Sequence, residues 1–149
     1  MSVFKQIMVS YDGTPFSHQA VQKAVDLAHL CNAEITIATV VPSYVPVIFD
    51  GYNYTNDPDR EKVEQTWIQE AHAAIDRLIK TLHITNLKIH PKVIKSDDVA
   101  HGLLKLAIKS HVDLMVMASH GRGPFQRLIL GSETHKVLTH TKIPVLVMR

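Results

Sequence analysis

Two kinds of hydrophobic pattern alternate along the chain. Short runs rich in apolar and β-branched residues have the length of strands, and longer stretches repeat apolar residues every three or four positions, as amphipathic helices do. The expected strands cover residues 3–11, 33–41, 87–94, 113–118 and 143–148. The expected helices cover residues 17–31, 61–82 and 99–111, with a fourth in the segment that contains Gly131-Ser132 and ends at Thr141.

Alternating strands and helices whose strands are apolar throughout predict a parallel sheet covered on both faces. The third strand contains Pro91, which lacks a backbone N–H and is tolerated mainly at a sheet edge. The pattern therefore predicts one domain over residues 1–149, an α/β doubly wound five-stranded parallel sheet of order 3-2-1-4-5 with four helices on both faces. Ligands of such sheets bind beyond the carboxyl ends of the strands where the winding reverses, here after strands one and four.

Local signals fix several element ends. Thr14 can cap the first helix with Pro15 in its first turn, and Asp97 or Asp98 can cap the third. Trp67 falls on the apolar side of the second helix and is expected in the core. The segment 42–59 holds four of the nine aromatic residues beside several prolines. It is expected to be a long loop, which either serves the site or covers the sheet and the next helix.

Composition places the chain among ordinary globular proteins. Of 149 residues, 46% are hydrophobic and 20% charged, enough for a core without disulfides or metal. The net charge is +2 and no basic run is longer than a pair, so a nucleic-acid partner is not expected. Cys31 is the only cysteine and is expected in the core. The ten histidines are scattered, which favours structural or solvated roles over a metal site.

The first residues carry too short an apolar stretch for a signal peptide or a membrane span. The expectation is a cytoplasmic protein with no membrane partner.

Two unusual stretches fall where the topology puts the crevice. Asp12-Gly13-Thr14 follows the first strand, and residues 119–123 follow the fourth with two glycines and Arg122. Gly131-Ser132 then opens a helix whose free N–H groups and hydroxyl could bind phosphate. Asp12 could accept hydrogen bonds from a ribose hydroxyl or a base amino group; alternatively, it only caps the first helix.

Several enzyme classes lack their motifs. The chain has neither G-x-x-x-x-G-K-[ST] nor a G-x-G-x-x-G after the first strand, so efficient ATP hydrolysis and dinucleotide oxidoreduction are not supported. A G-x-S-x-G elbow is also absent, which argues against hydrolase chemistry. No catalytic residue is assigned.

The chain resembles the universal stress proteins. Ala118-Ser119-His120-Gly121, nine residues and then Gly131-Ser132 are similar to their nucleotide motif, G-2x-G-9x-G-[S/T]. The likeness extends to Asp12-Gly13-Thr14, to residues 113–117 and to residues 139–145, so it spans nearly the whole chain. It implies an adenine nucleotide alpha hydrolase-like fold.

In the ATP-binding branch of that family, an aspartate after the first strand and a valine at the end of the second hold the adenine side. The resemblance implies this role for Asp12 and Val40. The first motif glycine approaches the ribose, and this chain has Ala118 in its place. The later glycines and the hydroxyl hold the phosphates, which implicates Gly121, Gly131 and Ser132. The candidate nucleotide-binding residues are Asp12, Gly13, Val40, Ala118, His120, Gly121, Arg122, Gly131, Ser132 and Glu133.

The leading hypothesis is a cytoplasmic stress-response protein that binds ATP or a related adenine nucleotide, with Mg as a candidate cofactor. Binding would change its affinity for partners, with little or no turnover of the nucleotide. The alternative is a nucleotide-free interaction module of the same fold, supported by Ala118. A third, weaker possibility is an enzyme of nucleotidyl chemistry. The apolar last strand leaves an open edge, which predicts a homodimer with Ile143, Val145 and Val147 at its interface; alternatively, Pro144 and the terminal tail protect this edge. Other protein partners are unknown.

Overall fold

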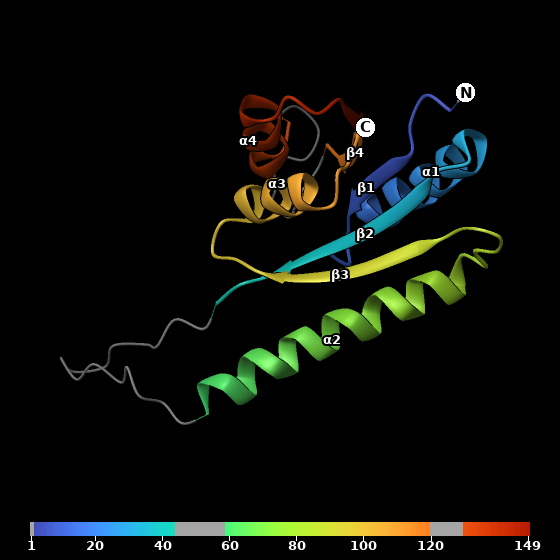
Figure 1. The fold of residues 1–149 in the computed structure, drawn as a ribbon. Helices are drawn as coiled ribbons and strands as arrows, with labels where there is room; N and C mark the ends of the chain where they lie inside the picture. Colours follow the sequence, from blue (N-terminus) through green and yellow to red (C-terminus); the bar gives the residue numbers. More distant parts are fainter. Residues whose placement is uncertain (1, 44–58, 120–129) are drawn as a thin grey trace.

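A computed structural model describes residues 2–43, 59–119 and 130–149 of the chain. They form the expected alternation of strands and helices (Figure 1). The elements are β1 (Gln6–Ser10), α1 (Pro15–Cys31), β2 (Glu34–Val41), α2 (Arg60–Thr81), β3 (Ile89–Lys95), α3 (Val99–Lys109), β4 (Leu114–Ala118), α4 (Ser132–His140) and β5 (Val145–Met148). The strands are mostly shorter than the apolar runs, because a run continues into turns where no neighbouring strand pairs with it.

The five strands make one parallel sheet in the order β3-β2-β1-β4-β5. This confirms the predicted strand order. The winding therefore reverses between β1 and β4, and the loops that follow these two strands leave the sheet at the same end.

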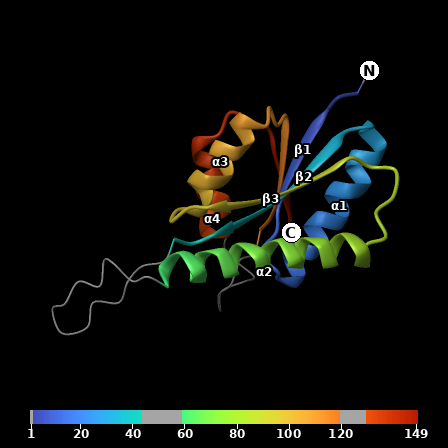
Figure 2. The same cartoon turned by 60° about the horizontal axis from the view of Figure 1, so that its bottom comes forward.

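Helices cover both faces of the sheet (Figure 2). On one face, α1 and α2 pack on a cluster that includes Ile7, Ile37 and Val116. On the other face, α3 and α4 pack on a cluster that includes Met8 and Met115. Adjacent residues of one strand thus lie in different clusters, as the alternation of side chains in a strand requires.

The helix caps follow the predicted chemistry. The Thr14 hydroxyl accepts a hydrogen bond from the Ser17 N–H at 3.2 Å, and Pro15 begins α1. At α3 the two candidates separate: Asp98 accepts from the His101 N–H at 2.9 Å. The Asp97 carboxylate accepts instead from the Ser43 N–H at 3.1 Å, at the end of β2.

Pro91 lies on β3, at the predicted edge. The Lys88 carbonyl accepts from the Ile35 N–H, and the Ser96 N–H donates to the Val41 carbonyl, so even-numbered residues of β3 direct their peptide groups toward β2. By alternation, Pro91 directs its peptide nitrogen outward. The missing N–H therefore costs no hydrogen bond inside the sheet, and it removes a donor from the open edge.

The placement of Trp67 in the core is wrong. Its side chain is only half-buried, and it belongs to neither core cluster. The fully buried apolar residues of α2 are Ile75 and Leu78, which lie further along the helix. The N-terminal half of α2 is instead tied to β3 by the buried Glu64, whose carboxylate contacts the Lys95 ammonium at 2.8 Å.

Glu34 should make the stability of the fold depend on pH. Its carboxylate accepts from His90 at 2.8 Å and from Lys88 at 2.9 Å, and these contacts lower its pKa from 4.5 to about 2. Because the folded pKa lies below the unfolded one, this stabilisation is complete above pH 4.5 and is lost as the pH falls toward 2. Urea unfolding of wild type and Glu34→Gln should give midpoints that differ near neutral pH and converge on acidification. A constant difference across this range would contradict the pairing.

Candidate functional site

Peptide groups of β2 border the crevice at the carboxyl end of the sheet. The Tyr11 N–H donates to the Ala38 carbonyl at 2.8 Å, and strand pairing between β1 and β2 ends at Ser10 and Ala38. Val40 lies two residues further along β2, so its N–H and carbonyl point to the same side as those of Ala38. They face the space beyond the end of β1, where a planar base could read one donor and one acceptor.

Asp12 is built into the turn at one side of this space. Its Oδ1 accepts from the Thr14 N–H at 2.9 Å and from the Thr14 hydroxyl at 2.6 Å. Gly13 has a φ of +81°, in the left-handed region that favours glycine. The carboxylate therefore does support the start of α1, as the capping alternative holds, while Asp12 remains an exposed residue at the crevice.

The N-terminus of α4 is held against the end of β4. The Gly131 N–H donates to the Ser119 carbonyl at 2.7 Å, and the Thr134 hydroxyl donates to the Ala118 carbonyl at 2.9 Å. Ser132 is the first residue of α4 and is exposed. Gly131, at the cap position, has no side chain to cover the first N–H groups of the helix. These donors and the positive end of the helix dipole suit an anion.

Ala118 fits its position without strain. It ends β4, and it is absent from the residues with positive φ in the described ranges. Its side chain packs with the cluster under α1, on the face of the sheet opposite α4. The methyl group that replaces a motif glycine therefore points away from the helix that would carry phosphates.

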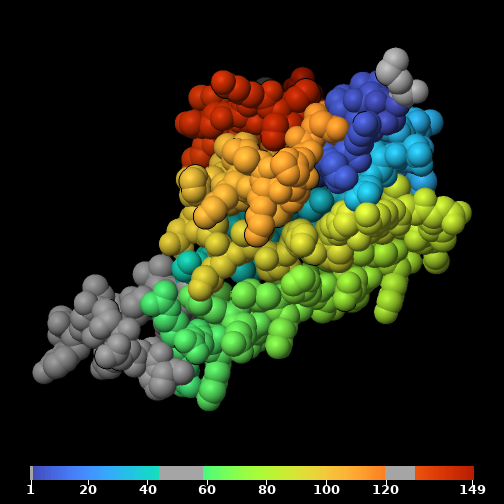
Figure 3. Space-filling view, viewed as in Figure 1, coloured from blue at the N-terminus to red at the C-terminus, as the bar shows by residue number. Residues whose placement is uncertain are grey.

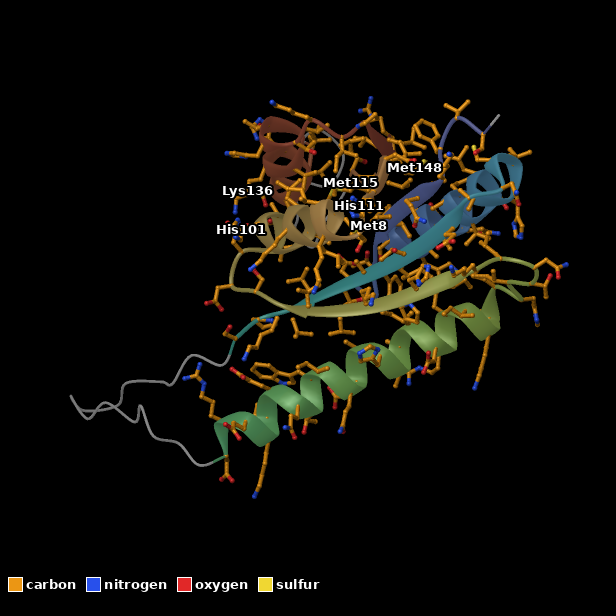
Figure 4. The ribbon with its side chains drawn as sticks, in the orientation of Figure 1. Met8, His101, His111, Met115, Lys136 and Met148 are labelled. Atoms are coloured by element: carbon orange, nitrogen blue, oxygen red, sulfur yellow. The ribbon has the colours of Figure 1, made fainter. Side chains whose placement is uncertain are left out.

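Glu133 has a partner that the sequence did not indicate. Its Oε2 accepts from the Ala100 N–H in the first turn of α3 at 3.0 Å. Its Oε1 lies 3.4 Å from the Lys136 ammonium, which is also 3.6 Å from Asp98 Oδ2. Figure 4 shows Lys136, in the middle of α4, on the same side of the molecule as His101 near the start of α3. The site helix is thus fastened to α3 by its own first turn.

The charged groups that join α3 and α4 stabilise one another. The backbone N–H of His101, followed by the charge of Lys136, lowers the pKa of Asp98. The Glu133 carboxylate, which bonds the ammonium, raises the pKa of Lys136. Both shifts favour the charged forms of Asp98 and Lys136.

Other predicted contacts lie outside the described residues. These are His120, Gly121 and Arg122, together with residues 44–58 of the expected loop. The Glu133 carboxylate, also predicted to contact the nucleotide, accepts instead from the Ala100 N–H of α3. The other six candidates within the described ranges all lie at the carboxyl end of the sheet: Asp12, Gly13, Val40, Ala118, Gly131 and Ser132. Their contact with a nucleotide stays a prediction.

Neither a metal centre nor a membrane span is found in the described part of the chain. Residues 2–43, 59–119 and 130–149 contain no group of three or more histidine, cysteine, aspartate or glutamate side chains placed to hold a metal ion. None of the four described helices is long and apolar enough to cross a bilayer.

Comparison with known sequences decides the family. A sequence model described as the universal stress protein family matches residues 4–149. The chain belongs to the universal stress protein family. This universal stress protein is 29% identical over 135 residues to universal stress protein A homolog 1 of Coxiella burnetii, a match that covers 91% of this chain and 89% of the relative.

Solved universal stress proteins share the fold. UspA from Lactobacillus plantarum superposes with a TM-score of 0.81 at 21% identity, over 97% of each chain. A universal stress protein solved in complex with cAMP superposes with a TM-score of 0.65 at 25% identity, over 99% of each chain. The adenine nucleotide alpha hydrolase-like fold expected from the sequence is thereby confirmed.

Proposed function

We propose that this universal stress protein binds ATP or a related adenine nucleotide in the crevice between the loops after β1 and β4, and acts as a nucleotide-responsive regulator. One observation carries the proposal: α4 begins directly against the end of β4, through the 2.7 Å bond from the Gly131 N–H to the Ser119 carbonyl. A helix N-terminus fixed at the switch point of a doubly wound sheet is suited to phosphate. The similar protein that binds cAMP supports an adenine nucleotide as the ligand class.

The proposed pose divides the nucleotide between two ends of the crevice. The base reads the Val40 N–H and carbonyl, and the exposed Asp12 accepts from the base amino group or a ribose hydroxyl. Phosphates lie at Gly131 and Ser132, where the hydroxyl could also join a Mg²⁺ bound to them. Gly13 and Ala118 leave room for the sugar, and His120, Gly121 and Arg122 are proposed to complete the phosphate side.

Hydrolysis of the bound nucleotide is proposed to be slow or absent. The protein is also proposed to be cytoplasmic. The sequence has no Walker lysine, which in ordinary P-loop ATPases binds the β- and γ-phosphates and neutralises the charge that develops during phosphoryl transfer. A nucleotide-free module of the same fold is the competing function. Its support was Ala118, whose methyl group packs away from α4.

Calorimetric titration of nucleotide-stripped protein with Mg-ATP tests the proposal. Asp12→Ala should weaken ATP binding by about tenfold or more, because a charge-assisted hydrogen bond contributes about 1.5–3 kcal/mol. Asp12→Asn is the matched control: its amide oxygen can still accept from Thr14, so its melting temperature should stay near that of wild type while ATP binding weakens. Wild type that binds no ATP would favour the nucleotide-free module. Full affinity in Asp12→Ala would remove Asp12 from the site.

A homodimer through β5 is also proposed. The Met115 N–H donates to the Pro144 carbonyl and the Ser119 N–H to the Met148 carbonyl, so even-numbered residues near β5 face β4. Ile143, before the strand, donates its N–H to the Thr141 hydroxyl at 3.0 Å, whereas Val145 and Val147 direct their peptide groups to the open edge. A second β5 strand could pair with these groups across a twofold axis.

Val147→Pro tests the pairing of two β5 strands without removing a hydrogen bond inside the sheet. Val147→Pro removes an outward N–H and no bond to β4, as Pro91 does on β3. Light scattering at micromolar concentration should give a dimer for wild type and for Val147→Ala, which keeps the N–H, and a monomer for Val147→Pro. Monomeric wild type would refute the dimer, and dimeric Val147→Pro would move the interface away from β5.

A further inference from the structure

A groove of about 450 Å³ opens at the end of β2, beside the turn that follows β1. The alternation of β2 places Thr39 and Val41 on the same face as Ile37, which packs under α1 and α2. The groove is therefore on the face of the sheet opposite α4 and the proposed phosphates. The residues that line it are Tyr11, Asp12, Gly13, Thr39, Val41, Pro42, Trp67, Glu70, Ala71 and Ala74.

One side of the groove is a single face of α2. Trp67, Glu70, Ala71 and Ala74 lie three, four and seven residues apart, which brings them to one stripe of a helix. Ala71 and Ala74 are too small to fill the space over β2, whereas Ile75 and Leu78 are buried in the core at the next positions. The hollow thus results from two small side chains where a core-facing helix normally carries large ones. In Figure 3, α2 and β3 form one continuous surface at the side of the molecule seen there.

The walls suit a flat, apolar group. Trp67 and Tyr11 are half-buried and supply aromatic surface from α2 and from the end of β1. Val41, Pro42 and the two alanines add aliphatic surface. The volume falls in the range of about 300–1,000 Å³ typical of small-molecule sites.

The described residues of the lining carry charge of one sign. Asp12 and Glu70 are their carboxylates, and no lysine, arginine or histidine is among them. Aromatic faces and carboxylates both attract cations. An anionic ligand such as a nucleotide phosphate is correspondingly disfavoured in this groove.

We infer that this groove is a second ligand site, which takes a small aromatic molecule carrying a positive charge. The ring packs between α2 and the end of β2, against Trp67 and Ala71. The ammonium group lies at the Glu70 side of the groove. The site is separate from the proposed nucleotide crevice, although the turn at Asp12 and Gly13 borders both.

Trp67 provides a direct readout, because it is the only tryptophan in the chain. Phenethylamine is the probe and phenylacetate is its matched control, since both carry one phenyl ring and their charges are opposite. Titration of the full chain with phenethylamine should shift Trp67 emission with a dissociation constant on the order of 1 mM, as expected for so few ligand atoms. Phenylacetate should bind at least about tenfold more weakly. Equal responses to both probes, or no response to phenethylamine, would overturn the inference.

Three variants locate the binding. Ala71→Leu fills the groove and should abolish the phenethylamine response while leaving ATP binding intact. Glu70→Gln should weaken phenethylamine by about two- to fivefold, in the range of an exposed ion pair. Gly131→Glu, designed to lose ATP, should keep the full phenethylamine response, so the two sites fail independently. An Ala71→Leu variant that still responds, or an ATP-induced Trp67 shift that persists in Gly131→Glu and competes with phenethylamine, would refute the assignment.

Discussion

ATP binding is expected to weaken by at least about a hundredfold when Gly131 is replaced by glutamate. Gly131 has a φ of −53°, which any L-residue can adopt, so the change should leave the backbone intact. The new carboxylate would stand beside the first N–H groups of α4, where the phosphates are proposed to bind. Like charges held that close cost several kcal/mol, and about 2.7 kcal/mol already corresponds to a hundredfold. Calorimetric titration with Mg-ATP measures the loss.

Gly131→Gln separates charge from bulk. The amide has the size of the carboxylate and no charge, so it should weaken ATP binding less than Gly131→Glu does. Adenosine carries no phosphate, and its affinity should differ little between the two variants. If Gly131→Glu bound ATP as tightly as wild type, the phosphates would have to lie away from α4.

Replacing Ile75 by alanine is expected to lower the free energy of unfolding by about 2–5 kcal/mol. Ile75 is fully buried and, with Leu78, supplies the large apolar contacts that hold α2 on the sheet. Truncation removes its transfer free energy and leaves a cavity. The N-terminal half of α2 has no comparable side chain in the core, so no neighbour can take over its contact. Urea unfolding monitored by circular dichroism gives the value.

Ile75→Val is the graded control, with an expected loss of about 0.5–1.5 kcal/mol. Trp67→Leu, at a half-buried position, should cost less than Ile75→Ala although it removes more atoms. The opposite order would show that the Trp67 side of α2, and not the Ile75 side, holds the helix in place.

The strand order was predictable because a single residue, Pro91, determines which strand lies at one edge of the sheet. Pro91 restricted the third strand to an edge, and the apolar strands required helices on both faces, which left the order 3-2-1-4-5 as the natural winding. The direction of the Pro91 nitrogen was not predictable. It depends on the register between β2 and β3, which only the paired backbones reveal.

The same distinction holds for the site. Asp12 and Gly131 could be brought together from topology alone, because parallel strands place the loops that follow them at one end of the sheet. The bond from Glu133 to the Ala100 N–H joins two helices separated by a strand, and no local spacing encodes it. Trp67 was misplaced for a related reason. Its helical stripe is apolar, but Ala71 and Ala74 leave that stripe too shallow to bury an indole.

The two edges of the sheet are unequal, and the difference would limit how many copies the proposed assembly can contain. At β3 the outward row of peptide groups lacks the donor of Pro91, and the exposed Lys92 is beside it. At β5 the outward row carries the N–H groups of Val145 and Val147. A sheet with two uninterrupted pairing edges can add copies without limit, as fibrils do, whereas the outward row of β3 is interrupted at Pro91. The proposed assembly through β5 would consume this edge in both copies and so would end at a dimer.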